Sequence, residues 1–292
     1  MGFLAIRSRR ILALLLFFFA LAVPGSWQSI ISRADERPCT AQDGALADVE
    51  GRILEHNTRK SPVPVDPSIA RPFNAEAAQL RAEKISLLNA KNACVVATLR
   101  IGGPPPAALT PAQKTSMADG ATAARPRWTS PGPVARTPSG RATIPSSHPL
   151  FPLWKVVRAM DTPMRPYPDV PLQGIPRPPI GYQHPSGYEV VDDGRGNPAV
   201  SPDHIVPKVE ILYLPRFLEL TPENMWEVIN APSNMQWLPR YVNEQLKNSR
   251  SAADMKNVDP TWQRQQDQLQ ERKRRELTIL IGELADTQIP AQ

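Results

Sequence analysis

The sequence predicts an α+β protein, and two observations carry this prediction. Apolar residues recur at helical spacing before residue 101 and again after residue 260. Between these regions, two short strand candidates, 188–191 and 199–200, flank the segment 193–197, whose Gly, Asp and Asn content is typical of a turn. A chain of 292 residues is long enough for one or two domains with a substantial core.

The first 26 residues have the features of a secretory signal peptide. Arg7, Arg9 and Arg10 precede the apolar run 11–23, and small residues follow it. That run is shorter than the roughly 20 residues that a membrane-spanning helix needs. We therefore expect residues 1–26 to direct export, so that the mature chain is periplasmic or secreted and has no stable membrane span. An uncleaved membrane anchor is the alternative.

Residues 39–101 are predicted to form a helical hairpin. Its second half repeats apolar residues every seven positions, which indicates a helix packed against another helix: Phe73, Leu80, Leu87, Cys94 and Ile101. Two helices joined by a short connection run antiparallel, so the start of the first lies beside the end of the second. This places Cys39 near Cys94 and predicts a disulfide in an oxidising compartment; two free thiols are the alternative.

Residues 102–180 hold more than half of the 34 prolines of the chain. Up to about residue 147, Pro, Ala, Ser, Thr and Arg dominate, which predicts a disordered or polyproline-II linker. The apolar residues that follow, such as Trp154 and Val157, indicate a segment that wraps around the next domain.

That next domain is predicted to span 181–286 and to be rich in helix. Thr221-Pro222 and Asp259-Pro260 each combine a capping side chain with a proline suited to the first helical position. The first of these helices should end near Asn230, and the second should form the C-terminal helix. A further short helix is expected from about Pro239 onward.

Three polar motifs lie within this domain at defined spacing. Asp203 and His204 begin the segment Asp-His-Ile-Val-Pro, Asn234 lies in Pro-Ser-Asn-Met-Gln-Trp-Leu, and Asn243 follows Asn234 by nine residues. Together they resemble the signature of HNH endonucleases (the ββα-metal or His-Me finger family) in its His-Asn-Asn form, of the bacterial polymorphic-toxin type. The resemblance implies that a β-hairpin delivers Asp203 and His204 at its end, and that a helix carries Asn243.

The resemblance also implies a role for each of these residues. His204 would be the general base that removes a proton from the attacking water. Asp203 and Asn243 would supply oxygen ligands to one divalent ion, with Mg²⁺ or Mn²⁺ as the best match. Asn234 would position the His204 loop through hydrogen bonds to the backbone, because an amide has no useful proton chemistry.

Two cations follow Asn243 at helical spacing. Lys247 and Arg250 lie four and seven positions later, so all three residues share one face of a helix. This arrangement would suit the gripping of nucleic-acid phosphates beside the metal. A solvated basic face is the alternative. Unlike many members of the family, the chain has no cysteine pairs near Asn243 to hold a structural zinc ion.

Taken together, these motifs predict an exported, metal-dependent endonuclease that acts on DNA or RNA, of the toxin type. The net charge of +6 and the pI near 9.5 favour an anionic partner without requiring one. A toxin would also need an immunity protein in the producing cell. The alternative is a non-catalytic exported protein that uses an HNH-like scaffold for binding or structure.

Overall fold

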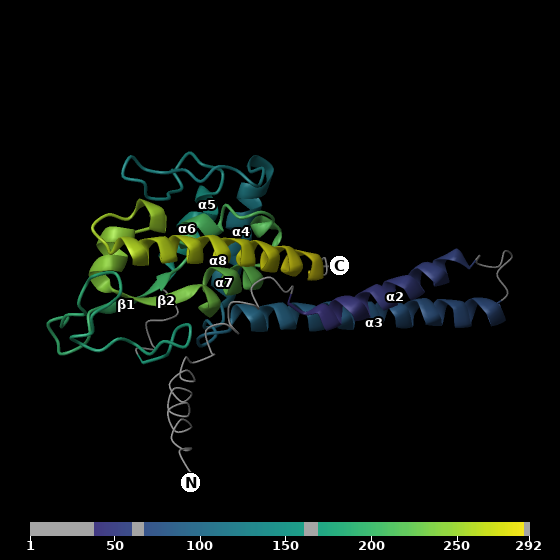
Figure 1. Cartoon of the computed structure of the whole chain (residues 1–292). Helices are drawn as coiled ribbons and strands as arrows, with labels where there is room; N and C mark the ends of the chain where they lie inside the picture. Colours follow the sequence, from purple (N-terminus) through teal and green to yellow (C-terminus); the bar gives the residue numbers. More distant parts are fainter. Residues whose placement is uncertain (1–37, 60–66, 161–168, 289–292) are drawn as a thin grey trace, which may run out of the picture. The chain divides into compact units, whose positions relative to one another are not determined.

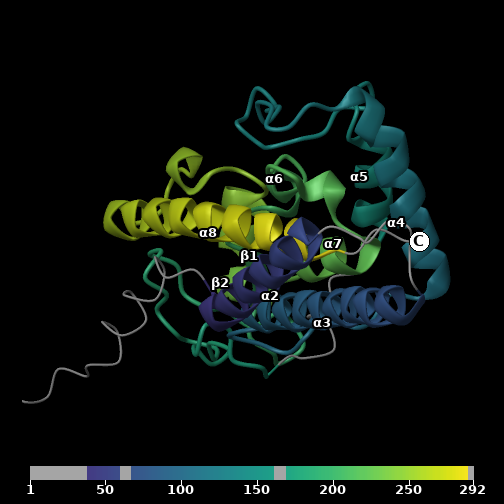
Figure 2. The same ribbon diagram turned by 90° about the vertical axis from the view of Figure 1, so that its right-hand side faces the viewer.

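The computed structural model describes residues 38–59, 67–160 and 169–288. The predicted signal peptide at 1–26 lies outside these ranges. Two antiparallel helices, α2 (Thr40–Thr58) and α3 (Pro67–Leu99), run side by side at the start of the described chain (Figures 1 and 2). Leu46, Val49 and Leu80 are buried between them. The architecture is therefore α+β with a helical hairpin over the region where the heptad pattern predicts one.

A disulfide closes this hairpin at its base. It joins Cys39, just before α2, to Cys94 in α3, with a distance of 6.0 Å between the two Cα atoms. This is the pair that the sequence predicts. The same end of the hairpin is tied to the last helix, α8 (Pro260–Thr287). Lys91 of α3 pairs with Asp43 of α2 at 2.6 Å and with Glu283 of α8.

The region 102–180 differs from the linker predicted there. Residues 111–124 form the helix α4 (Pro111–Ala124), which begins with a capping box between Thr110 and Gln113 and has Pro111 at its start. The 3₁₀ turn η1 (Arg125–Arg127) continues it, and α5 (Phe151–Ala159) packs against it. A Cβ atom at Gly120 would lie 2.9 Å from the Cα of Leu153, so the two helices can approach this closely only at a glycine. The composition of this region predicted disorder because its many small residues were expected to bury too little apolar surface to form a core.

The main hydrophobic core joins segments that the sequence assigned to separate domains. It combines buried residues of α3, α4, α5, α7 and α8, among them Leu99, Met117, Leu153, Ile229 and Ile281. Residues from Pro38 onward therefore form one compact unit. The predicted division into a hairpin, a linker and a module at 181–286 is not found, because no one of these parts contains the whole core.

The sheet consists of two antiparallel strands that are distant in sequence. β1 (Val200–His204) pairs with β2 (Met235–Pro239), in a register that sets His204 opposite Met235. The predicted pairing of 188–191 with 199–200 is limited to a short hairpin around the bridge between Asp192 and Pro198, in which the N–H of Ala199 donates to the carbonyl of Val191 at 2.8 Å. The partner of β1 was missed because strand pairing between distant segments leaves no local pattern in the sequence.

The chain between the strands is mostly helical. It contains α6 (Lys208–Ile211), η2 (Phe217–Glu219), α7 (Pro222–Ile229) and η3 (Pro232–Asn234). As predicted, α7 begins after the capping residue Thr221, and α8 begins after Asp259, which accepts hydrogen bonds from the backbone of residues 261 and 262.

After β2 the chain enters a short π-helix, η4 (Val242–Lys247). It ends where Asn248 and Ser249 adopt left-handed backbone conformations, with φ of 39° and 64°. The 3₁₀ turn η5 (Ala252–Asp254) then leads to α8. In the described part of the chain, no helix has the combination of length and hydrophobicity that a membrane span requires.

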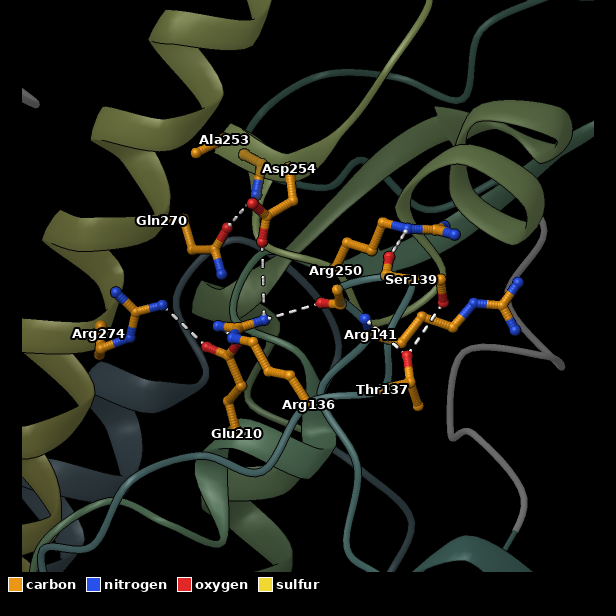
Figure 3. A network of polar contacts seen from close by, with 12 residues as sticks. Arg136, Thr137, Ser139, Arg141, Glu210, Arg250, Ala253, Asp254, Gln270 and Arg274 are labelled. Atoms are coloured by element: carbon orange, nitrogen blue, oxygen red, sulfur yellow. Dashed lines mark hydrogen bonds and ion pairs between the residues drawn. The ribbon is translucent and has the colours of Figure 1, made fainter.

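A buried carboxylate connects α6, α8 and the loop around residue 136 (Figure 3). Glu210 of α6 is 2% exposed and receives hydrogen bonds from Arg136 at 3.0 Å and from Arg274 of α8 at 2.8 Å. The basic run at 272–275 is therefore more than a solvated face, since one of its arginines neutralises a buried acid.

We predict that Arg274→Ala lowers the free energy of unfolding by about 1.5 to 3 kcal/mol, because Glu210 loses one of its two charged donors. The neighbouring residues Arg272 and Arg275 are exposed, so alanine there should change stability by no more than about 0.5 kcal/mol. Urea unfolding of the three variants measures the difference. Equal stabilities would show that Glu210 does not need Arg274.

We also predict that no free thiol is detected when the protein from an oxidising compartment is alkylated without reductant. Replacing both Cys39 and Cys94 by serine should lower the free energy of unfolding by about 4 kcal/mol, because the unfolded chain regains the freedom of a long loop. Mass spectrometry and chemical unfolding provide the two measurements. A serine variant as stable as the wild type would contradict the prediction.

Candidate functional site

The candidate site lies at the end of β1, where Asp203 and His204 are the last two residues of the strand. Neighbouring residues of a strand point to opposite faces of the sheet. Asp203 accordingly contacts Lys247 of η4 and Gln236 of β2, whereas His204 contacts the carboxyl end of α7 at Ile229. The side chains of Asp203 and His204 therefore contact different elements on opposite faces of the sheet.

Asn234 clamps the loop that follows His204. Its Oδ1 accepts a hydrogen bond from the backbone N–H of Val206 at 2.9 Å, and its Nδ2 donates to the carbonyl oxygen of the same residue at 3.0 Å. The backbone N–H of Ile205 donates to the carbonyl of Asn234 at 2.8 Å. The side chain of Asn234 is fully buried. These are contacts of the kind that the sequence motif assigns to this asparagine.

His204 is held in one tautomer by its surroundings. Its Nε2 lies 3.0 Å from the carbonyl oxygen of Ile229, which can only accept a hydrogen bond, so Nε2 carries a proton. Burial, with the nearby charges of Lys208 and Lys247, holds the pKa of His204 well below its usual value. The ring is therefore neutral at pH 7, and its Nδ1 has a lone pair. A neutral imidazole with a free lone pair is the form that a general base requires.

Lys247 reaches into the same region from η4. Its side chain is 3% exposed, and its Nζ lies 2.5 Å from Oδ2 of Asp203. The same ammonium group donates to the carbonyl oxygens of His204 at 2.5 Å and of Ile205 at 3.1 Å. Three acceptors surround a group that has three hydrogens to donate.

Asp203 is buried and has two donors on the same oxygen. Besides Lys247, the Nε2 of Gln236 donates to Oδ2 of Asp203 at 2.9 Å, and Gln236 is itself linked to Gln266 of α8. Burial raises the pKa of Asp203, while the charge of Lys247 and the hydrogen bond from Gln236 oppose this shift.

Asn243 and Lys247 share a face of η4, but that face meets β1. The Nδ2 of Asn243 donates to Oγ of Ser201 at 2.9 Å and to the carbonyl of Pro202 at 3.2 Å. In a π-helix, whose bonds run from i to i+5, residues four apart still lie nearly one above the other. The predicted shared helix face therefore holds for Asn243 and Lys247, although it points toward β1, and it does not hold for Arg250, which lies beyond the end of η4.

The two predicted phosphate-binding cations have other partners. Lys247 is buried against Asp203, as described above. Arg250 lies beyond the end of η4 and donates to the carbonyl oxygens of Gln245, Leu246 and Ser139 at 3.2, 2.9 and 2.8 Å. These bonds cap the π-helix and attach it to the loop near residue 139 (Figure 3). The structure thus corrects the expectation for Lys247, which is buried, whereas Arg250 remains partly exposed while it bonds backbone carbonyl groups.

One of the two predicted metal ligands, Asp203, already has a cationic partner. Its Oδ2 accepts hydrogen bonds from Lys247 and Gln236. A second cation beside Asp203 would also meet the buried ammonium group, which repels it. Among the residues that the structure describes, no three His, Cys, Asp or Glu side chains converge as a metal site. The Mg²⁺ or Mn²⁺ assignment remains a prediction.

Three contacts of the site were not predicted from the sequence: the amides of Gln236 and Gln266, and the carbonyl of Ile229. Gln236 faces Asp203 directly across the strand pair, so the register of β1 with β2 would have found it. No sequence pattern identifies the other two, because α7 and α8 approach the site only in the folded chain. A cavity of about 550 Å³ between α4, α7 and α8 includes none of the predicted site residues.

We predict that Asn234→Ala lowers the free energy of unfolding by about 2 to 4 kcal/mol, because it leaves the buried N–H and C=O of Val206 without partners. Asn230 provides a matched control. It is also buried, but its Nδ2 donates to a carbonyl, that of Trp226, which the backbone N–H of Asn230 also reaches. Asn230→Ala should therefore cost less, about 1 kcal/mol. If chemical unfolding shows that both variants lose the same free energy of unfolding, the clamp formed by Asn234 contributes no more than the single hydrogen bond of Asn230.

Comparisons with models of known protein families, with curated proteins and with solved structures gave no match to this chain. The chemistry of the site is thus defined by its own geometry. The geometry consists of a neutral histidine in a fixed tautomer, an asparagine clamp on its loop, and a buried ammonium group beside an aspartate.

Proposed function

We propose that this protein is an HNH-type endonuclease that hydrolyses phosphodiester bonds of DNA or RNA, with His204 as the general base. One observation carries the proposal: the neutral ring of His204, held through Nε2 by the carbonyl of Ile229, on a loop that Asn234 clamps. The order of strand, strand and helical segment in β1, β2 and η4 adds support, since it agrees with the resemblance of the sequence motifs.

The proposed reaction uses water as the nucleophile. The Nδ1 of His204 takes a proton from the water while its oxygen forms a bond to phosphorus. The bond between phosphorus and the departing sugar oxygen breaks, and that oxygen takes up a proton from solvent. The products are a phosphate monoester and a hydroxyl group, and the histidine returns its proton to solvent. A positioned general base accelerates such a step by about 10²- to 10⁴-fold.

The proposal includes export and a toxin-type role. The disulfide between Cys39 and Cys94 suits an oxidising compartment, such as the periplasm or the exterior of the cell. The net charge of +6 suits a polyanionic substrate. A nuclease that reaches nucleic acid would endanger the producing cell, so we propose that an immunity protein accompanies it.

A second candidate function deserves a test because of one observation. Lys247 is buried and its ammonium group bonds Asp203 and two backbone carbonyls, so it does not contribute to a surface for phosphate. This would suit a non-catalytic exported protein in which the same scaffold serves binding or structure. Such a protein would cleave neither DNA nor RNA under any metal condition.

We predict that the purified protein cleaves plasmid DNA or RNA and that His204→Gln lowers the rate by about 10²- to 10⁴-fold. A glutamine amide can still donate to the carbonyl of Ile229, but it has no basic nitrogen. His148→Asn is the matched control, since the Oδ1 of asparagine can still accept the hydrogen bond from the backbone of Leu150. Gel assays and circular dichroism measure activity and folding.

A folded His204→Gln variant that cleaves as fast as the wild type would refute the role of His204. A wild-type protein that cleaves neither substrate, with or without added metal, would instead favour the non-catalytic alternative.

A further inference from the structure

We propose that Lys247 supplies the cation of this site, so that cleavage proceeds without a divalent metal ion. This inference rests on the proposed function for its catalytic part, whereas its statement about cation binding stands independently. The observation behind it is the contact set of the Lys247 ammonium group, which bonds the carboxylate of Asp203 and the carbonyl oxygens of His204 and Ile205.

These three oxygens form a site of the kind that binds a hard cation. Carboxylate and backbone carbonyl oxygens are the usual ligands of Mg²⁺ and Ca²⁺ in proteins. Here all three approach one nitrogen, at distances between 2.5 and 3.1 Å. The position next to Asp203 is therefore filled by a charge that belongs to the chain itself.

A free divalent ion would have to displace this charge. Lys247 and Asp203 are 3% and 5% exposed, so the displaced ammonium group would remain buried without a partner. Leaving one member of a buried ion pair uncompensated typically costs several kcal/mol. Asn243 contributes none of the three oxygens around the ammonium group, and its Nδ2 holds β1 through Ser201 and Pro202.

The position of Lys247 also explains how it acts on His204. It bonds the carbonyl oxygen of His204 itself and the carbonyl of the next residue, so it fixes the backbone that carries the imidazole. Asn234 fixes the same loop one residue further along, at Val206. Lys247 is thus a positioning residue whose charge lies near the base.

The wild-type protein provides the first part of the test. We expect isothermal titration calorimetry to detect no Mn²⁺ binding that depends on Asp203, and thermal unfolding to give the same Tm in EDTA as in Mg²⁺. Cleavage should continue in EDTA. Mn²⁺ binding that is lost in Asp203→Asn, or a Tm that falls in EDTA, would overturn the inference whether or not the protein cleaves nucleic acid.

Lys247→Ala provides the second part, because it should empty the oxygen site. We expect this variant to gain Mn²⁺ binding, and Lys247→Ala combined with Asp203→Asn to lose it again. A merely structural lysine would not predict this gain. Without metal, the rate of Lys247→Ala should fall about 10- to 100-fold, as for residues that orient a reactive group, and Mn²⁺ should restore part of it.

A folded Lys247→Ala variant that binds no Mn²⁺ would also overturn the inference. If this variant does not fold, the wild-type titration and the Tm comparison still decide the question. Failure of the proposed function is distinguishable, because a protein without nuclease activity in any condition can still show the predicted pattern of Mn²⁺ binding.

Discussion

The C-terminal half of this structure depends on the hydrogen bonds that the buried ammonium group of Lys247 donates to the end of β1. An ammonium group removed from water needs an acceptor for each of its three hydrogens. The acceptors come from Asp203, His204 and Ile205, so the end of β1 and the π-helix η4 must lie against each other. Asn234, the last residue of η3 before β2, then holds the following residue, Val206. The contacts that create this part of the fold are the same ones that shape the candidate site.

The segments before residue 181 are part of the support of this site. Two tryptophans near it donate to backbone carbonyls far away in the sequence: Trp226 of α7 to Ala107 at 2.8 Å, and Trp237 of β2 to Val170 at 2.9 Å. The carbonyl of Ile229, which contacts Nε2 of His204, also belongs to α7. Displacement of the region around residue 107 would therefore change the position of the histidine ring. The strand pair and η4 are therefore embedded in a larger unit and are not a self-contained module.

The proposed role of His204 as a general base depends on how firmly the fold holds its ring and its loop. His204 has one nitrogen engaged by a backbone carbonyl and stands on a loop held at three successive residues, 204 to 206. A general base is effective when its position and its tautomer are fixed before the substrate arrives. The same rigidity could serve a structural role, and the difference between the two lies in whether Nδ1 acts on water.

The sequence by itself determined the features that depend on local contacts. Thr221 and Asp259 begin helices because each side chain bonds the backbone two or three residues later. The role of Asn234 as a clamp on the loop was implied by the resemblance of its motif. The pairing of Cys39 with Cys94 followed from a helical repeat and one short turn. Tertiary structure alone decided the helix α4 within the expected linker, the partner of β1, and the inward direction of Lys247. The reason is physical: a small residue such as Gly120, a strand edge or a long cation acquires its environment from segments distant in the sequence.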